Sequence, residues 1–384
     1  MTYVFIAAIE NSGDQLGAGL IRALRKQAPN VKLSGVGGPA MEAQGVSSPL
    51  DMSPLAVLGF IEPIKVYPLV VERVKQLCQL ILDTQPDSVV LIDSWGFMIR
   101  LAKALKKSGY KGQVIKYVAP QVWAMREGRA RILAQHVDHV LSLHSFDAPY
   151  FERYGLPVTY VGNPVLETDC NCGDGEGLKK QFKISAQDIV ISIFFGSRLS
   201  EIQQLAKPFA DAISLISEAV PNARFISPVS DVIATDVAAA AAQDMRLQKV
   251  ILLPESRKFD VFAASDVALA CSGTVTTQLA CAGVPAVVGY RLNPLTYHVA
   301  RHLYKPAYIS IVNIAADSAL MPEYMQKDCN GTALADGVLA YVHSETKRRA
   351  SRQALLAQTA KMRGQGGSAD TRAAKAILSL TAEA

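Results

Sequence analysis

Residues 188–201, Asp-Ile-Val-Ile-Ser-Ile-Phe-Phe-Gly-Ser-Arg-Leu-Ser-Glu, decide the fold of the second half of this 384-residue chain. The apolar run over 188–193 predicts a buried strand, and the apolar spacing of the residues after the stretch predicts a helix. The turn between them, Gly196-Ser197-Arg198, offers backbone N–H groups at a helix N-terminus and a guanidinium group, which together suit a phosphate or pyrophosphate. The stretch therefore predicts a parallel α/β unit that holds a phosphorylated ligand.

The rest of the chain repeats this alternation of strand-like and helical patterns, which predicts parallel sheets with helices on both faces. The expected strands are 3–9, 31–36, 88–92, 113–118, 138–143 and 157–161 in a first half, and 189–194, 223–227, 249–253, 266–270 and 285–289 in a second. The expected fold class is α/β, with two Rossmann-like doubly wound parallel-sheet domains that face a cleft. We expect domains at 1–166 and 178–345, a Gly-rich linker at 167–177 and a helical tail at 346–384.

The composition limits the classes of function. A net charge of +5 is weaker and less clustered than is usual for a nucleic-acid-binding protein, so no nucleic-acid partner is expected. The six cysteines are scattered, which indicates buried free thiols of a reducing compartment. Residues 3–9 lack a basic segment before them and predict a first strand rather than a signal peptide. No apolar run approaches the ~20 residues that span a bilayer, so the expected location is cytoplasmic.

Two other turns resemble Gly196-Ser197-Arg198 in composition. Residues 11–14, Asn-Ser-Gly-Asp, open a helix after the first expected strand, and Ser272-Gly273-Thr274 open another after 266–270. Small residues at a helix N-terminus leave N–H groups that favour an anion. Ordinary helix capping is the alternative for each turn. Three such turns at strand ends favour an anion site.

Asp93 is the candidate for a reacting carboxylate, because it follows the buried strand 88–92 at its carboxyl end. A carboxylate there can take a proton from an attacking hydroxyl. Capping of the next helix is the alternative that the sequence leaves open. The chain has no nucleophile elbow, no CxxC pair and no Asp-x-Asp, and His298 with His302 lacks a third ligand. We therefore expect a transferase that needs no metal and no cofactor.

Two segments indicate contact with a lipid surface. Residues 54–71 are unusually apolar, and Trp123 stands close to Arg126, Arg129 and Arg131. An apolar wedge with a basic rim is how a peripheral protein meets an anionic membrane. A core helix with a solvated basic face remains the alternative.

Taken together, the motifs resemble those of the lipid-A-disaccharide synthase family, which are inverting glycosyltransferases with two Rossmann-like domains, the GT-B fold. The resemblance covers almost the whole chain. It rests on 12–14, 16–24, 35–41, 55–62, Ile92-Asp93 with Phe97, 117–124 with Arg126, Gly196-Ser197-Arg198 with Glu201, 272–274, 289–291, 311–314 and 322–323.

The resemblance implies a reaction between UDP-2,3-diacylglucosamine and 2,3-diacylglucosamine 1-phosphate that forms a β-1,6 disaccharide and releases UDP. It makes Asp93 the base for the acceptor hydroxyl and Arg198 a catalytic residue that binds the acceptor phosphate or the charge on departing UDP. It also implies a peripheral protein on the anionic inner-membrane surface, and a homodimer. The substrate-binding residues that it implies are Glu10, Ser12, Gly13, Asp14, Trp123, Arg126, Asn163, Gly196, Ser197, Glu201, Ser272, Gly273, Thr274, Gln278, Arg291 and Asn313.

The sequence departs from the family pattern at several of these positions. Ile9 replaces a glycine, Trp95 and Gly96 replace a proline and a carboxylate, Asn163 replaces a histidine, and Gln278 replaces a glutamate. Two other hypotheses therefore stay open. One is a weak or inactive relative that binds a lipid A precursor or UDP, and the other is a different GT-B enzyme that acts on a UDP-sugar.

Overall fold

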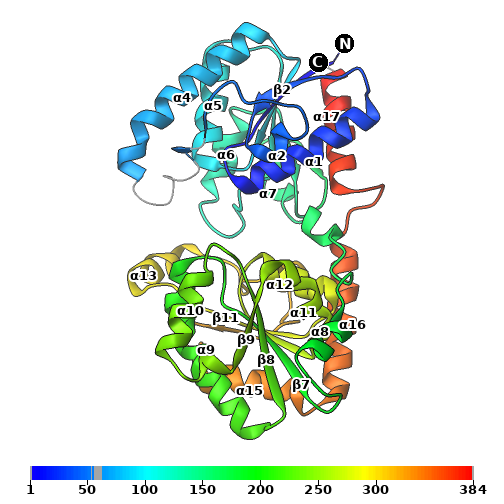
Figure 1. Ribbon diagram of the computed structural model, residues 1–384. Helices are drawn as coiled ribbons and strands as arrows, with labels where there is room; N and C mark the ends of the chain where they lie inside the picture. Colours follow the sequence, from blue (N-terminus) through cyan, green and yellow to red (C-terminus); the bar gives the residue numbers. More distant parts are fainter. Residues whose placement is uncertain (1, 53, 56–62, 383–384) are drawn as a thin grey trace. The chain divides into compact units, whose positions relative to one another are not determined.

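The computed structural model describes residues 2–52, 54–55 and 63–382, and it divides the chain into two compact units. The first unit comprises residues 1–164 and 364–384, and the second comprises residues 165–363. Each unit is built around one six-stranded parallel sheet with helices on its faces (Figure 1). The predicted fold class, α/β with two doubly wound parallel-sheet domains, is confirmed.

In the first unit the strands pair in the order β2-β1-β3-β4-β5-β6. The strands are β1 (Tyr3–Ala7), β2 (Lys32–Val36), β3 (Ser88–Ile92), β4 (Gln113–Tyr117), β5 (His139–Ser142) and β6 (Val158–Tyr160). The helices are α1 (Asn11–Gln27), α2 (Pro39–Glu42), α4 (Pro63–Thr84), α5 (Trp95–Lys107), α6 (Gly128–Ala134), α7 (Ala148–Glu152) and α17 (Ala369–Ala382). One core lies beneath α4, α5 and α6, and the other lies beneath α1 and α17. The central strands β1 and β3 are buried on both faces, which is why they are apolar without alternation.

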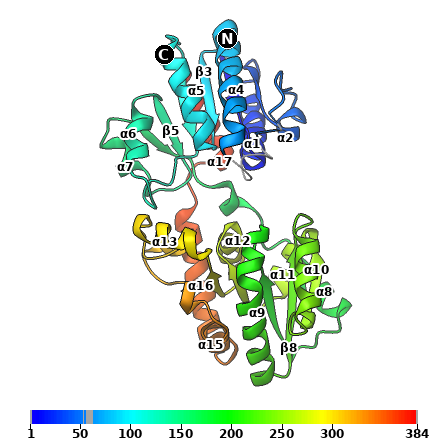
Figure 2. The ribbon, with the colours of Figure 1, turned by 90° about the vertical axis from the view of Figure 1, so that its left-hand side faces the viewer.

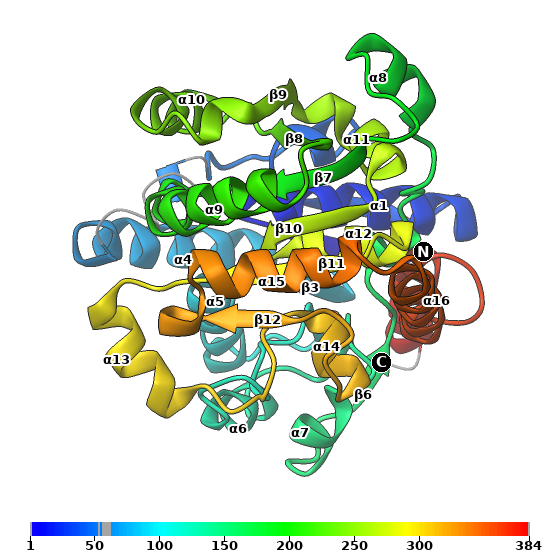
Figure 3. The same cartoon turned by 90° about the horizontal axis from the view of Figure 1, so that it is seen from below.

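In the second unit the order is β12-β11-β10-β7-β8-β9 (Figure 3). The strands are β7 (Ile189–Phe194), β8 (Ala223–Val229), β9 (Val250–Pro254), β10 (Val267–Cys271), β11 (Ala286–Tyr290) and β12 (Glu323–Met325). The helices are α8 (Gly175–Gln181), α9 (Leu199–Ala219), α10 (Ala234–Gln243), α11 (Lys258–Ala264), α12 (Thr274–Ala282), α13 (Pro294–Leu303), α14 (Ile311–Ala316), α15 (Gly331–Val342) and α16 (Glu345–Met362) (Figure 2). Four short 3-10 helices complete this part of the chain: η1 (Pro164–Glu167), η2 (Leu247–Lys249), η3 (Glu255–Arg257) and η4 (Gln326–Asp328). Strand β12 was not predicted, because its three residues, two half-buried and one exposed, carry no strand pattern.

The boundaries of the units differ from the expected ones. Residues 167–177 belong to the second unit and do not form a linker, because Cys170 is buried in its core and Gly175 lies against α11. A Cβ on Gly175 would lie 2.6 Å from the backbone carbon of Ala263, so the glycines of this segment serve close packing rather than flexibility.

The expected tail, 346–384, is divided between the two units. Helix α16 packs on α12 and α15 of the second unit, whereas α17 packs on α1 of the first. The Gln27 side chain donates to the Thr371 carbonyl at 2.8 Å, and the Arg372 guanidinium donates to the Val161 carbonyl at 2.7 Å. Apolar residues of α17, Ala373 and Ile377 among them, complete the core beneath α1.

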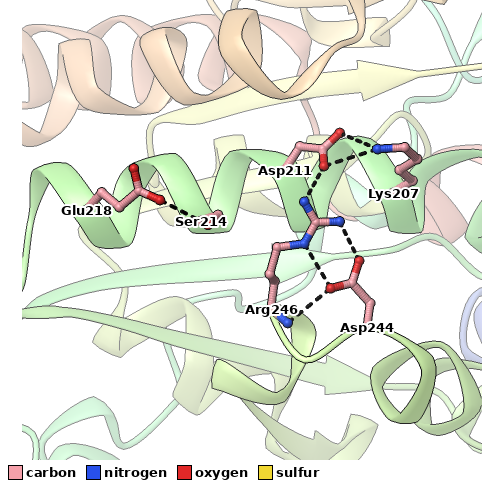
Figure 4. A network of polar contacts seen from close by, with 6 residues as sticks. All are labelled: Lys207, Asp211, Ser214, Glu218, Asp244 and Arg246. Carbon is pink, nitrogen blue, oxygen red and sulfur yellow. Dashed lines mark hydrogen bonds and ion pairs between the residues drawn. The ribbon is translucent and has the colours of Figure 1, made fainter.

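A polar network fastens the segment after α10 to α9 (Figure 4). The Arg246 guanidinium binds Asp211 of α9, and it donates to the Asp244 carboxylate at 2.6 and 2.8 Å. Lys207 approaches Asp211 from the other side at 3.0 Å. These side chains are partly exposed, so their contribution to stability is small. The network joins α9 to the segment after α10, and Arg198 is the N-cap residue at the start of α9.

The glycines of 35–38 have a packing role in the first unit. A Cβ on Gly35 would lie 2.1 Å from the Ile6 carbonyl oxygen of the paired strand, and a Cβ on Gly37 would lie 2.4 Å from the Met41 sulfur. We expect Gly35→Ala to lower the free energy of unfolding by about 1–3 kcal/mol, measured by urea denaturation. Gly128→Ala is the control, because nothing lies within 4 Å of a Cβ at Gly128. Equal stability of Gly35→Ala and the wild type would contradict this packing.

Candidate active site

A pocket of about 340 Å³ lies at the carboxyl ends of β7, β8, β9 and β10 in the second unit. Its volume falls within the roughly 300–1,000 Å³ of small-molecule sites. The pocket brings together these residues from the sequence prediction: Gly196, Ser197, Arg198, Glu201, Ser272, Gly273, Thr274 and Gln278. Two of the three turns that were expected to hold an anion thus share one pocket.

The Glu201 carboxylate holds the turn after β7. It accepts hydrogen bonds from the backbone N–H groups of Ser197 at 2.7 Å and Arg198 at 3.3 Å. Gly196 has φ of +108°, and a Cβ there would lie 2.3 Å from Glu201, so this turn requires glycine. Glu201 also binds the Arg198 guanidinium at 3.1 Å, and the Arg198 side chain remains 64% exposed. The guanidinium is therefore held at one nitrogen and accessible to a ligand.

The turn after β10 leaves the N-terminus of α12 open toward the pocket. The N-cap residue is Gly273, which supplies no side-chain cap, and nothing lies within 4 Å of where its Cβ would be. Thr276 turns its hydroxyl back to the Gly273 carbonyl at 2.7 Å rather than toward the N–H groups. The first N–H groups of α12 are thus placed to bind an anion, with the helix dipole in support.

Sequence reasoning missed the residues that follow β8 and β9. Ser230, Glu255 and Lys258 line the pocket, so Lys258 is a second cation among its lining residues, with Arg198. Its ammonium group lies 3.5 Å from Glu255. The sequence did contain a signal for these residues, because they follow predicted strands and the carboxyl ends of parallel strands meet at one edge of the sheet. The sequence prediction was based on glycine- and serine-rich turns, so it did not include the polar residues after 249–253.

Two predicted substrate-binding residues, Arg291 and Asn313, lie outside the residues that line this pocket. Asn313 is completely buried, and its amide donates to the Met321 carbonyl at 2.7 Å and to Glu323 at 2.8 Å. Its amide oxygen accepts from the Met321 N–H at 3.0 Å. The Asn313 side chain fixes the chain before β12, and its contact with substrate stays a prediction. Arg291 donates to the Gln326 carbonyl at 3.1 Å.

In the first unit, Asp93 lies at the carboxyl end of β3 and its carboxylate accepts a hydrogen bond from the Ser12 hydroxyl at 3.3 Å. Asp93 has φ of 49° and Ser94 has φ of 36°, both in the left-handed region. Ser94 is the N-cap residue of α5, and that helix begins at Trp95. The alternative in which Asp93 caps the helix is therefore not what the structure shows.

The other predicted residues of the first turn have different positions. Asp14 is buried, and its carboxylate accepts from the N–H groups of Gly38, Ala40 and Met41 at 2.8, 2.8 and 3.0 Å. Both oxygens of Asp14 hold the start of α2, and contact of Asp14 with substrate stays a prediction. Glu10 is the half-buried N-cap residue of α1, and a Cβ on Gly13 would meet Ala8 at 3.4 Å. Asn163 is half-buried near the end of the first segment of this unit.

Trp123 belongs to a buried aromatic cluster and not to an exposed wedge. Its side chain is 6% exposed and meets the Phe146 ring edge-on at 5.4 Å, and Phe146 stacks on His144 at 5.2 Å. The membrane role expected for Trp123 is therefore corrected. Nearby, Arg126 has φ of 55°, and the Arg129 guanidinium lies 5.0 Å from the Trp95 ring.

The apolar segment 54–71 is described only in part, since residues 56–62 lie outside the described residues. On α4, the Tyr67 side chain is 52% exposed and Val71 is 47% exposed. Among the residues that the structure describes, no helix is long and apolar enough to cross a membrane. Nor do three or more His, Cys, Asp or Glu side chains gather as a metal site within the described ranges.

Comparison with known proteins agrees with this architecture. The family model described as lipid-A-disaccharide synthetase matches residues 4–377. The lipid-A-disaccharide synthase of Rhodospirillum centenum is 38% identical over 98% of this chain and 94% of the relative. That of Paramagnetospirillum magneticum is 35% identical over 98% and 96%. The chain belongs to the lipid-A-disaccharide synthase family. The predicted family and the glycosyltransferase class are confirmed.

Solved structures share the fold of this lipid-A-disaccharide synthase family member at low identity. The UDP-GlcNAc 2-epimerase from Neisseria meningitidis bound to UDP-GlcNAc has a TM-score of 0.62 at 12% identity, and the match covers 100% of both chains. The S. aureus MnaA-UDP co-structure has a TM-score of 0.63 at 12% identity, over 98% of this chain and 95% of the other. At such identities the likeness shows the fold alone.

Asp147, the buried N-cap residue of α7, makes the stability of the chain depend on pH. Burial raises the pKa of Asp147 from 3.8 to about 6, although Ser142 donates a hydrogen bond to it. Between pH 3.8 and about 6, the folded chain therefore holds a proton on Asp147 that the unfolded chain has already released. The stability that protonated Asp147 supplies is lost as the pH rises through 6. Burial also lowers the pKa of His144 to about 4.

We therefore expect the wild type to gain about 1–2 kcal/mol of unfolding free energy relative to Asp147→Asn when the pH falls from 7.5 to 4.5. Urea denaturation at the two pH values measures the difference, and His144 is present in both chains, so its own titration cancels. Glu152→Gln, at an exposed site on α7, is the control and should show no such change. A pH-independent difference for Asp147→Asn would contradict the assignment.

Proposed function

We propose that this chain transfers 2,3-diacylglucosamine from UDP-2,3-diacylglucosamine to the 6-hydroxyl of 2,3-diacylglucosamine 1-phosphate. The products are the β-1,6-linked disaccharide 1-phosphate and UDP. The observation that supports it best is the family match over residues 4–377, together with an anion pocket in the second unit.

The pocket of the second unit is the proposed site for the diphosphate of the donor. The open N–H groups at the start of α12 and the cations of Arg198 and Lys258 suit two phosphate groups. When the bond between the sugar C1 and the diphosphate oxygen breaks, negative charge builds on UDP. The exposed guanidinium of Arg198 then stabilises the leaving group.

Asp93 in the first unit is the proposed base. Its carboxylate takes the proton of the acceptor 6-hydroxyl, the acceptor oxygen forms a bond to C1 of the donor, and UDP leaves from the opposite side. The Ser12 hydroxyl orients the carboxylate through the bond at 3.3 Å. A base that acts this way contributes about 10²–10⁴-fold to the rate.

Membrane association is also proposed. The exposed Tyr67 and Val71 on α4, with the Arg100 guanidinium 5.4 Å from the Tyr67 ring, support contact of this helix with an anionic lipid surface. A location on the cytoplasmic face of the inner membrane follows from the substrates proposed here. The homodimer implied by the resemblance stays a prediction, which sedimentation equilibrium tests.

We expect Asp93→Ala and Arg198→Ala each to lower turnover at least ~10²-fold, because one removes the base and the other the leaving-group cation. Mass spectrometry of the disaccharide formed from both purified diacylglucosamine substrates measures this. Arg224→Ala, an exposed arginine on β8, is the control and should keep normal turnover. Normal turnover of either site variant removes that residue from the mechanism. Absence of disaccharide with the wild type, while UDP still binds, favours the inactive relative.

The membrane proposal predicts weaker association when negative charge is placed on α4. Tyr67→Glu with Val71→Glu should reduce co-flotation with phosphatidylglycerol vesicles at least ~5-fold, since each added carboxylate is repelled by the anionic lipid and removes an apolar contact. The exposed pair Val232→Glu and Met245→Glu in the second unit is the control. Equal flotation of all three proteins would reject α4 as the contact.

A further inference from the structure

A buried lysine lies beneath the proposed base. Lys116, in β4, is 2% exposed, and strand pairing places it between Leu91 of β3 and Val140 of β5. These neighbours and Val114, two residues earlier on the same face, belong to one apolar core. A lysine at such a position is rare, because burial of an ammonium group opposes folding unless every N–H has an acceptor.

The Lys116 ammonium group has those acceptors. Its three N–H groups match three backbone carbonyls, those of Leu91 at 3.3 Å, Tyr117 at 3.2 Å and Asp93 at a shorter distance. A protonated lysine offers three donors and no acceptor, so this arrangement fits the charged form. A neutral amine would turn its lone pair toward one of the carbonyl oxygens.

The backbone at and next to two of these carbonyls is strained. Asp93, Ser94 and Val118 have φ of 49°, 36° and 71°, and a β-branched residue such as Val118 is especially unfavourable there. The Asp93 N–H donates to the Tyr117 carbonyl at 3.0 Å, and the same carbonyl accepts from Lys116. Strained backbone persists only where its surroundings hold it. Here the ammonium group ties the end of β3 to the end of β4.

We propose that Lys116 is the positioning residue for Asp93, and that its ammonium group holds the strained backbone that presents the carboxylate. The inference rests on the proposed role of Asp93 as the base. Lys116 acts on the reaction through Asp93 and does not touch substrate.

The charge of Lys116 links this arrangement to pH. Burial lowers the pKa of Lys116 to about 7, and the nearby carboxylates of Asp93 and Glu10 oppose that shift. The unfolded chain keeps the proton up to the ordinary value of 10.5, so between about 7 and 10.5 it binds more protons than the folded chain. The contribution of Lys116 to stability therefore rises with pH in this window, while the third donor of the ammonium group is lost. As the pH rises from about 7 to 10.5, the activity should therefore fall while the contribution of Lys116 to stability rises.

Three variants test the proposal. Lys116→Met keeps the length of the stem and removes the donors, Lys116→Arg keeps a charge, and Lys111→Met is the control at an exposed site just before β4. We expect Lys116→Met to lower kcat at least ~10-fold with KM changed less than ~3-fold, and Lys111→Met to match the wild type. The wild-type kcat should fall above pH ~7, and Lys116→Arg should lack that alkaline fall. A folded Lys116→Met with normal kcat would overturn the proposal.

A double variant separates positioning from general damage to the fold. If Lys116 acts through Asp93, adding Lys116→Met to Asp93→Asn should lower kcat by less than ~2-fold beyond Asp93→Asn alone. If the loss of kcat in the double variant equals the product of the two single losses, Lys116 acts independently of Asp93 and the inference is overturned. Should Lys116→Met fail to fold, the pH profiles decide: the same alkaline fall in the wild type and Lys116→Arg would refute it.

Hydrogen exchange tests this inference without a measurement of enzyme activity, so its outcome is separate from that of the proposed function. Hydrogen exchange of the Asp93 amide, which is bonded to the Tyr117 carbonyl, should be at least ~10-fold faster in Lys116→Met than in Lys111→Met. Unchanged exchange refutes the inference even if the wild type makes disaccharide. If exchange is faster in Lys116→Met but the wild type makes no disaccharide, the role of Lys116 in holding the backbone is supported and the proposed function is refuted.

Discussion

Parallel pairing of buried strands is the constraint on which both units depend. Along the inner strands the backbone N–H and C=O groups bond to neighbouring strands on both sides, so the middle of the sheet offers a ligand few free polar groups. At the carboxyl ends the strands stop together, and the chain turns into helices whose first N–H groups lack partners. Polar chemistry is therefore confined to one edge of each sheet, and this is where the pocket and Asp93 lie.

The two edges are prepared in different ways. In the second unit, turns of small residues leave N–H groups open, and Glu201 uses its carboxylate to shape the turn while Arg198 stays accessible. In the first unit, the backbone itself is strained around Asp93, and a buried ammonium group holds it. The first arrangement suits an anion that arrives with the substrate, and the second suits a carboxylate that must be aimed.

Several residues of the family motifs make contacts within the protein that hold its elements in place. The Asp14 carboxylate holds the start of α2, and the Asn313 amide holds the chain before β12. Trp123 packs edge-on against Phe146 in a buried cluster. Such positions support the site by fixing the elements that carry it, which is how a motif extends beyond the groups that meet substrate.

The sequence by itself determined the alternation of strands and helices, the strand that ends at Asp93, and the turns around Arg198 and Gly273, because apolar period and glycine placement are local signals. Only the tertiary structure decided that α17 completes the first unit, that Gly175 packs on α11, and that Lys258 joins the pocket. It alone placed the ammonium of Lys116 against the carbonyls of Leu91 and Asp93, which lie 25 and 23 residues earlier in the chain. The physical reason is that these contacts join residues far apart in the chain, so the sequence around a residue does not indicate its partner across the sheet.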